Sequence, residues 1–294
     1  MPELPEVETV RLGLNQVTLH QPIAGGDVLL DRTIAYPQPT LVFLAGIQGR
    51  AIAQWHRRGK YLLAELTDIS SRSSSFPPSS PIPPSPAWLG VHLRMTGQLL
   101  WLSKADPLHK HCRVRLDFGN GRELRFLDQR TFGQMWYVPP GIAPATIITG
   151  LQRLGPEPLS PEFSCRYLTE KLSDRQRPIK NALLDQALVA GIGNIYADEA
   201  LFLSGIRPQI HCAKLRPKRI ARLHAAIQQV LQTAIDARGT TFSDFRDIAG
   251  TNGNYGSIAW VYNRDGQLCR VCSSGIQRLK LAGRSAHFCP QCQR

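Results

Sequence analysis

The sequence predicts an α+β fold with three parts: a β-rich N-terminal domain, a helical domain and a small C-terminal hairpin built around four cysteines. Three observations in the 294 residues lead to this prediction. Segments such as WLGVHLRMTGQLLWL alternate apolar and polar residues between positions 23 and 138, which is typical of the strands of a sandwich or barrel. Helical spacing of apolar residues dominates positions 161 to 248. Two Cys-x2-Cys pairs follow near the end of the chain.

The predicted boundaries follow changes in composition. Residues 1–138 form the β-sandwich domain, 139–160 a proline-rich linker, 161–256 the helical domain and 257–294 the cysteine hairpin. Between two predicted strands lies the segment 70–87, which contains six prolines and eight serines. Because such a stretch can neither join a β-ladder nor bury a core, we expect it to be a disordered or polyproline-like excursion.

Two helices have recognisable ends. Pro5 suits the first position of an N-terminal helix, and Glu6 and Glu8 suit its first turn. The segment RIARLHAAIQQVLQTAIDARG places its apolar residues on one helical face. Gly239 is predicted to end that helix at the C′ position.

The charge of the chain points to a polyanionic partner. The formal net charge is +13 and the pI is about 9.8, so nucleic acid or an anionic membrane surface would be attracted. No apolar run reaches the roughly 18 residues of a membrane span. The acidic start MPELPEVETV lacks the features of a secretory signal, so we expect an intracellular, cytoplasmic protein. Of the two polyanions, nucleic acid is the expected partner and a membrane is not.

Four cysteines have the spacing of a metal site. Cys269 and Cys272 are separated by two residues, as are Cys289 and Cys292, and sixteen residues lie between the pairs. Four thiolates in this arrangement match a closed tetrahedral zinc shell, which predicts one structural Zn²⁺. A pair of disulfides is the less favoured alternative.

Two further segments could bind an anion. The glycine turn of GIGNIYADEALF is followed by Asn194, predicted as the N-cap of a helix whose free N–H groups would face a phosphate. The loop between the cysteine pairs contains Arg278, Lys280 and Arg284. Each segment could equally be an ordinary packing corner or a solvated basic turn.

The N-terminus could carry a nucleophile. Removal of Met1 would expose Pro2 as a secondary amine, and α-amines titrate near pH 8, so a useful fraction is neutral at pH 7. Glu3 stands beside it as a candidate general acid or base. Read alone, MPELPE is also an ordinary helix start.

Taken together, these segments resemble a known family. The segments MPELPEVETV, HRRGKYL, HLRMTGQL, LDQRTFG, LGPEPLS, GIGNIYADEALF and CRVCSSGIQRLKLAGRSAHFCPQC occur in this order in Fpg-type formamidopyrimidine-DNA glycosylases, which the chain resembles from end to end. The resemblance implies a β-sandwich followed by a helix-two-turn-helix domain with a zinc finger. It also implies a monomer that acts on damaged double-stranded DNA without a nucleotide cofactor.

The resemblance further implies the reaction and the residues that perform it. The family excises oxidised purines, such as 8-oxoguanine and formamidopyrimidines, through a Schiff base on the N-terminal proline, followed by β,δ-elimination. The implied catalytic residues are Pro2, Glu3, Lys60 and Arg284. The implied DNA-binding residues are His111, Arg130, Arg175 and Asn194, together with Met95 and Phe132, which with Arg130 would fill the gap left by an extruded nucleotide.

The chain departs from the family pattern in two places, and three alternative functions are compatible with its sequence. Gln129 and Thr131 stand where many members have proline and arginine, so one basic charge is missing beside Arg130. The excursion at 70–87 is foreign to the family pattern. A relative of endonuclease VIII acting on oxidised pyrimidines, an inactive damage sensor and a zinc-dependent transcription factor are the alternatives, and Leu4 favours the purine class.

Overall fold

The computed structural model describes residues 1–69, 85–241 and 245–294, which pack as two compact units. Unit 1 comprises residues 1–2, 6–152 and 241–253, and unit 2 comprises residues 3–5, 153–240 and 254–294. Most of the predicted excursion at 70–87 lies outside the described residues, but its last residue is not part of an excursion. Ala87 is the first residue of a central strand, β5 (Ala87–His92).

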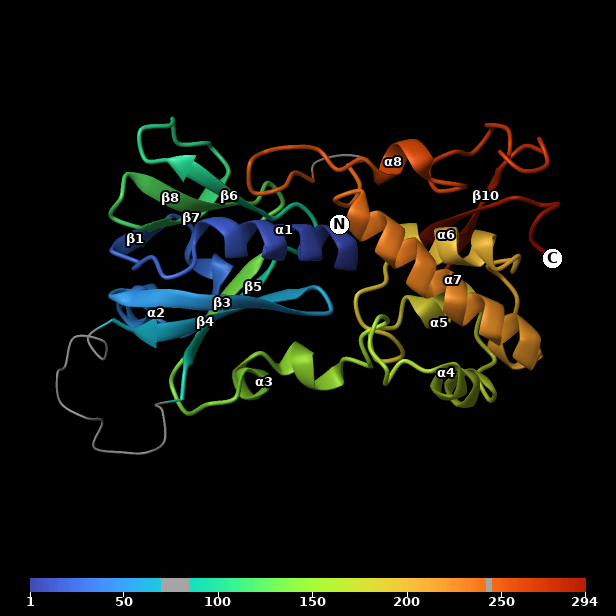
Figure 1. The fold of residues 1–294 in the computed structure, drawn as a ribbon, viewed down its shortest axis with the longest axis horizontal. Coiled ribbons are helices and arrows are strands. Elements are labelled where there is room, and N and C mark those ends of the chain that lie inside the picture. Colours follow the sequence, from blue (N-terminus) through green and yellow to red (C-terminus); the bar gives the residue numbers. More distant parts are fainter. Residues whose placement is uncertain (70–84, 242–244) are drawn as a thin grey trace. The chain divides into compact units, whose positions relative to one another are not determined.

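Unit 1 is a sandwich of two sheets, which confirms the predicted β-sandwich (Figure 1). The five-stranded sheet has the order β2-β9-β5-β4-β3 and the four-stranded sheet the order β1-β7-β8-β6. All pairings are antiparallel except that of β2 with β9. The strands are β1 (Gly25–Val28), β2 (Ile34–Tyr36), β3 (Arg50–Arg58), β4 (Tyr61–Asp68), β5 (Ala87–His92), β6 (Gln98–Ser103), β7 (Cys112–Asp117), β8 (Arg122–Leu127) and β9 (Gln134–Val138).

One apolar core fills the space between the two sheets. Strand β7 shows why, since its residues alternate between buried and half-buried positions and so bury only one face. Helix α1 (Leu4–Val17) adds Val7, Val10 and Leu14 to this core, at the i, i+3 and i+7 spacing of one helical face. Phe245 and Ile248, from the segment 245–253, also join it. The shorter helical elements of unit 1 are η1 (Asp31–Thr33), α2 (Thr40–Ile47), α3 (Pro144–Ile147) and η3 (Thr149–Arg153).

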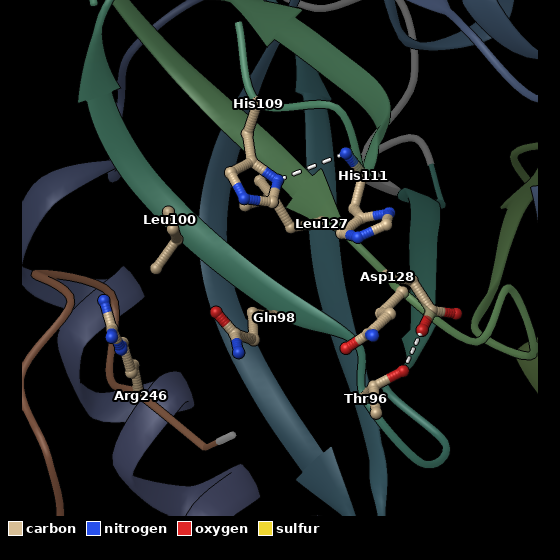
Figure 2. A pocket seen from close by; sticks show the side chains of 9 residues that line it. Thr96, Gln98, Leu100, His109, His111, Leu127, Asp128 and Arg246 are labelled. Atoms are coloured by element: carbon tan, nitrogen blue, oxygen red, sulfur yellow. Dashed lines mark hydrogen bonds between the residues drawn. The ribbon is translucent and has the colours of Figure 1, made fainter. Parts of the chain in front are cut away.

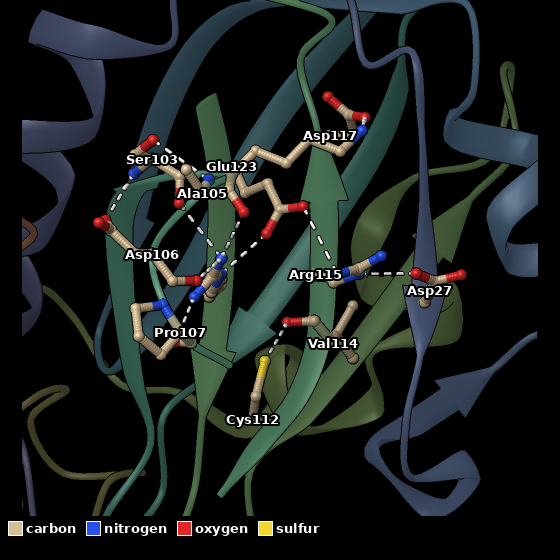
Figure 3. Close-up of polar contacts among 12 residues, drawn as sticks. Asp27, Ser103, Ala105, Asp106, Pro107, Cys112, Val114, Arg115, Asp117 and Glu123 are labelled. Atoms are coloured by element: carbon tan, nitrogen blue, oxygen red, sulfur yellow. Dashed lines mark hydrogen bonds and ion pairs between the residues drawn. The ribbon is translucent and has the colours of Figure 1, made fainter. Parts of the chain in front are cut away.

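A buried arginine shapes the loop that leaves β6. Arg125 on β8 is 1% exposed and forms an ion pair with Glu123, at 2.8 Å between Nε and Oε2 (Figure 3). Its two terminal nitrogens donate to the main-chain carbonyls of residues 103, 104, 106 and 107, at 2.9 to 3.4 Å. Only a guanidinium has enough N–H groups for this set of acceptors, so one side chain fixes the path of the loop.

Unit 2 is helical and ends in a two-stranded hairpin. The long helix α7 (Pro217–Asp236) buries the apolar face predicted from the sequence, which includes Ile220, Leu223 and Ile227. Its predicted end is wrong by one residue: Arg238 occupies the C′ position with a φ of 59°, and Gly239 follows. No helix among the described residues is long and apolar enough to cross a membrane. The elements are α4 (Cys165–Leu172), α5 (Ile179–Leu183), α6 (Asn194–Leu203), η4 (Cys212–Lys214), α7 (Pro217–Asp236), α8 (Tyr255–Ile258), β10 (Gln277–Leu281) and β11 (Arg284–Phe288).

Candidate functional site

The tight turn between β3 and β4 presents Lys60. Pro2 and Lys60 are both buried in unit 1, and Gly59 precedes the lysine with a φ of 55°, a conformation that favours glycine. Arg57 supports this turn, because its Nη1 donates to the carbonyl of Gly59 at 3.2 Å. Its Nε donates to Glu8 on α1 at 2.9 Å, so an ion pair ties the lysine turn to the N-terminal helix.

The Glu8 carboxylate is kept charged by two guanidinium groups. Burial would raise the pKa of Glu8, but the hydrogen bonds and charges of Arg11 and Arg57 outweigh it and lower the pKa below its usual value. Arg11 lies one helical turn further along α1, with its Nη2 2.6 Å from the Oε1 of Glu8. The carboxylate is therefore ionised at neutral pH.

A neutral histidine lies beside the lysine turn. Burial, together with the charges of Arg94 and Lys60, lowers the pKa of His92 to about 3. The ring is therefore uncharged at neutral pH, and its Nδ1 accepts the backbone N–H of Arg94 at 2.9 Å. Tyr61 packs edge-on against it, with ring centroids 4.5 Å apart.

A buried carboxylate organises the loop of residues 128–133, here called the Asp128 loop. Asp128 is 1% exposed and accepts hydrogen bonds from Thr96 Oγ1 at 2.5 Å and from the backbone N–H of Gly133 at 2.7 Å. Thr96 Oγ1 in turn accepts the backbone N–H of Arg130 at 3.0 Å. These bonds join the Asp128 loop to the loop that carries Met95. Asp128 was not among the predicted site residues, although it lies in the motif LDQRTFG.

The Asp128 loop exposes an aromatic ring. Phe132 is 53% exposed, which excludes a core position for this side chain. The guanidinium of Arg130 lies 5.1 Å from its ring centroid, within the range of a cation–π contact. Met95, on the neighbouring loop, is half-buried.

A cavity of about 300 Å³ opens next to these loops in unit 1 (Figure 2). His111 lies at its wall, and partial desolvation and the nearby Lys110 and Arg113 lower its pKa. Because an arginine can only donate, the contact of 3.2 Å from Arg113 Nη2 makes His111 Nδ1 an acceptor. The neutral ring then carries its proton on Nε2, ready to donate to a ligand. The cavity is lined by Thr96, Gln98, Leu100, His109, His111, Leu127, Asp128, Gln129 and Arg246.

In unit 2, Glu3 caps the N-terminus of helix α6. Its carboxylate is 2% exposed and accepts the backbone N–H groups of Gly193 at 2.7 Å, Ile195 at 2.9 Å and Tyr196 at 3.3 Å. Gly193, not Asn194, is the N-cap residue, so the predicted N-cap is wrong. A Cβ at position 193 would lie 2.4 Å from the Glu3 carboxyl carbon. Glycine is therefore required here for the close approach of Glu3.

Helix α6 also holds the hairpin through Asp198. This fully buried carboxylate pairs with Lys180, at 2.6 Å between Nζ and Oδ1, and accepts the backbone N–H of His287 at 2.9 Å. Lys180 Nζ also donates to the carbonyl of Ser285 at 2.5 Å. Ser285 follows Arg284, which is exposed at the start of β11. The network thus fixes the strand that presents Arg284.

The next residue on α6 anchors the segment leading to the cysteines. Glu199 accepts the backbone N–H groups of Trp260, Val261 and Tyr262 at 2.8 to 2.9 Å and the hydroxyl of Tyr255 at 3.1 Å. Burial raises the pKa of Glu199, against the effect of these four donors. Neither acid was among the predicted site residues, although two consecutive acids inside an otherwise apolar helical segment are a signal visible in the sequence.

The four predicted zinc ligands converge on one point. Their sulfur atoms all lie within 4.8 Å of one another. The Sγ atoms of Cys269 and Cys292 are 3.9 Å apart, and those of Cys272 and Cys289 are 3.4 Å apart. A tetrahedron with Zn–S bonds of about 2.3 Å has edges of about 3.8 Å, so the four thiolates fit one zinc ion. With no further ligand position, the site is structural.

The two remaining predicted DNA contacts lie in unit 2. Arg175 is half-buried, and its Nη1 lies 3.3 Å from Asp185, which also pairs with Arg177 at 2.6 Å. The positive charge of Arg175 is therefore partly balanced. Asn194 Nδ2 lies 3.4 Å from the hydroxyl of Ser285, next to Arg284 in the sequence.

Family models match nearly the whole chain. The formamidopyrimidine-DNA glycosylase N-terminal domain matches residues 1–135 and the H2TH domain of the same family matches residues 154–246. The zinc finger found in FPG and IleRS matches residues 266–294.

Full-length relatives and solved structures agree with these matches. The chain is 64% identical to a formamidopyrimidine-DNA glycosylase of Nostoc punctiforme, covering 100% of this chain and 96% of the relative. It is 60% identical to the enzyme of Trichodesmium erythraeum, with both chains fully covered. A complex of a Lactococcus lactis FPG mutant with DNA containing Fapy-dG has a TM-score of 0.87 at 32% identity, with both chains fully covered. A MutM complex with DNA containing carbocyclic 8-oxo-G has a TM-score of 0.85 at 32% identity, again over both full chains.

Proposed function

This chain belongs to the formamidopyrimidine-DNA glycosylase family, and we propose that it excises oxidised purines from double-stranded DNA and then cleaves the strand as an AP lyase. The observation that carries the proposal is the fixed carboxylate of Glu3, held by three backbone N–H groups next to Pro2 in the chain. An amine and a carboxylate on consecutive residues can reach the same sugar.

The first step is base release. Removal of Met1 exposes the amine of Pro2, whose lone pair attacks C1′ of the damaged nucleotide while the base leaves with the bonding electrons. Glu3 is the proton donor or acceptor for the sugar in this step. The Pro2 amine then gives up its proton, the C1′–O4′ bond breaks and O4′ takes up a proton. This leaves an iminium between Pro2 and C1′ of the opened sugar, which acidifies the proton on C2′.

Strand cleavage follows from that acidity. Loss of the C2′ proton expels the 3′ phosphate by β-elimination, for which Lys60 is the proposed acid–base residue. Loss of the C4′ proton through the conjugated iminium then expels the 5′ phosphate by δ-elimination, and Arg284 on the hairpin is the proposed phosphate contact. Zinc has no part in these steps and serves to fold the hairpin.

The target nucleotide must leave the base stack before Pro2 can reach C1′. Phe132, exposed on the Asp128 loop, is proposed to stack in the resulting gap together with Met95, while Arg130 hydrogen-bonds the orphaned base. Phosphate contacts by His111, Arg175 and Asn194 are proposed to hold the duplex. A neutral His111 suits a hydrogen bond better than an ion pair, in keeping with its lowered pKa.

Covalent trapping tests the nucleophile. The full-length protein is incubated with a duplex containing 8-oxoguanine and reduced with borohydride, and the DNA-linked peptide is mapped by mass spectrometry. We expect an adduct on a peptide that begins at Pro2 and lacks Met1. An adduct only on Lys60 would contradict the assignment.

Substrate choice tests the class. Excision of 8-oxoguanine and formamidopyrimidine well above excision of thymine glycol is expected. The reverse preference would support the endonuclease VIII-like alternative, and binding without excision would support a damage sensor.

A further inference from the structure

The Asp128 loop receives an arginine from elsewhere in unit 1. The residue at the centre of the loop, next to Arg130, is Thr131, so Arg130 is the loop's single arginine. Arg32 from η1, 99 residues earlier in the chain, donates through Nη2 to the hydroxyl of Thr131. We infer that Arg32 is a DNA-binding residue that provides a phosphate contact at this loop, an inference that rests on the DNA-binding function proposed above.

The position of Thr131 makes it a support for the guanidinium. Its backbone has a φ of 57°, in the left-handed region, so it marks the bend between Arg130 and Phe132. A hydroxyl at the bend can accept from Arg32 without adding charge of its own. Arg32 is thereby held at the same bend as the exposed aromatic ring.

The charge of Arg32 is available to a ligand. Among the described residues no carboxylate forms an ion pair with Arg32, and its neighbour Asp31 faces the hydroxyl of Thr40 at 3.4 Å. An arginine has five N–H donors, so one contact with Thr131 leaves others in a fixed fork. Arg130 is likewise unpaired with any described carboxylate and lies over Phe132.

The chemistry of this pair points to the DNA backbone. A planar guanidinium fork matches the two oxygens of a phosphate diester, and such contacts need no particular base. An aromatic side chain inserted in the stack brings the phosphates of the adjoining steps close to the protein surface. Arg32 is suited to one of these phosphates, while Arg130 remains free for the orphaned base.

The test measures the salt dependence of binding for four proteins. The wild type, Arg32→Ala, Arg32→Ala combined with Thr131→Arg, and the control Arg166→Ala are titrated with a duplex containing a tetrahydrofuran abasic analogue. Fluorescence anisotropy gives the dissociation constant between about 50 and 200 mM KCl. Arg166 is a matched exposed arginine, paired with Glu170 on the same helix.

We expect Arg32→Ala to weaken binding about tenfold at 100 mM KCl and to reduce the log–log salt slope by about 0.9, the value for one phosphate. Thr131→Arg in the same chain should restore the slope, and Arg166→Ala should leave it unchanged. A slope unaltered by Arg32→Ala, at unchanged melting temperature, would overturn the inference. If the wild type itself failed to bind the duplex, the proposed function would fail instead.

Discussion

The cap formed by Glu3 leads to a prediction about stability that is separate from chemistry. Glu3→Gln keeps the length of the side chain but replaces one carboxylate oxygen by an NH₂ group. Both carboxylate oxygens accept backbone N–H groups of the 193–196 segment. In the variant at least one of these donors faces another donor in a site that is 2% exposed.

The magnitude follows from these contacts. A buried donor left without an acceptor costs about 1–3 kcal/mol, and the loss of a negative charge at a helix N-terminus costs about 0.3–1 kcal/mol more. We expect the free energy of unfolding of Glu3→Gln to be about 3 kcal/mol lower than that of the wild type. At about 2–4 °C per kcal/mol, this corresponds to a fall of about 6–12 °C in melting temperature.

Differential scanning calorimetry of the full chain measures this change, with Glu170→Gln as the control. Glu170 is 62% exposed and pairs with Arg166 on the same helix, so its variant should melt within about 1 °C of the wild type. If Glu3→Gln melted as the control does, the capping argument would be wrong. A fall as large as predicted would require activity to be compared at temperatures where both proteins are folded.

Four further predictions concern other contacts. Asp128→Asn should cost about 1–3 kcal/mol in urea unfolding, because one of the two hydrogen bonds of the carboxylate is lost; an unchanged midpoint would contradict this. The difference in the free energy of unfolding between wild type and Glu8→Gln should be largest at pH 7 and should disappear as the pH falls through the lowered pKa of Glu8. Thermal melts recorded from pH 7 to 3 can follow this change. Because the folded pKa of His92 is about 3, the wild type should lose stability between pH 6.5 and 3 relative to His92→Asn, and an NMR titration showing a charged ring at pH 5 would refute this. Chelation of zinc, or Cys272→Ser, should lower both the melting temperature and DNA affinity, whereas full affinity in that variant would exclude a structural role for the metal.

The sequence was sufficient for features that depend on local pattern. The four cysteines were predicted as one cluster because a metal shell needs only ligand type and spacing, and their sulfur atoms do converge. The buried face of α7 was predicted because helical period fixes which residues share a side. The family was recognised because its motifs recur in order along the chain.

Features that depend on contacts between distant segments were not predictable in this way. Nothing near Asn194 in the sequence indicates that Glu3, about 190 residues earlier, supplies the capping oxygens. Arg32 and Thr131 are also distant in the sequence, 99 residues apart, and a single exposed arginine carries no pattern. Asp198 and Glu199 were visible only as acids in an apolar segment, and their backbone partners become known once the hairpin is placed.

Arg125 has a consequence for how the chain can vary over evolution. Its hydrogen bonds to the loop of residues 103–107 all go to main-chain carbonyls, which every amino acid possesses. Substitutions in that loop therefore leave the acceptors of these four hydrogen bonds in place. The arginine itself has no such freedom, since lysine offers a single nitrogen in place of the fork. One side chain in the sheet would thus permit substitution at the four residues whose carbonyls it binds.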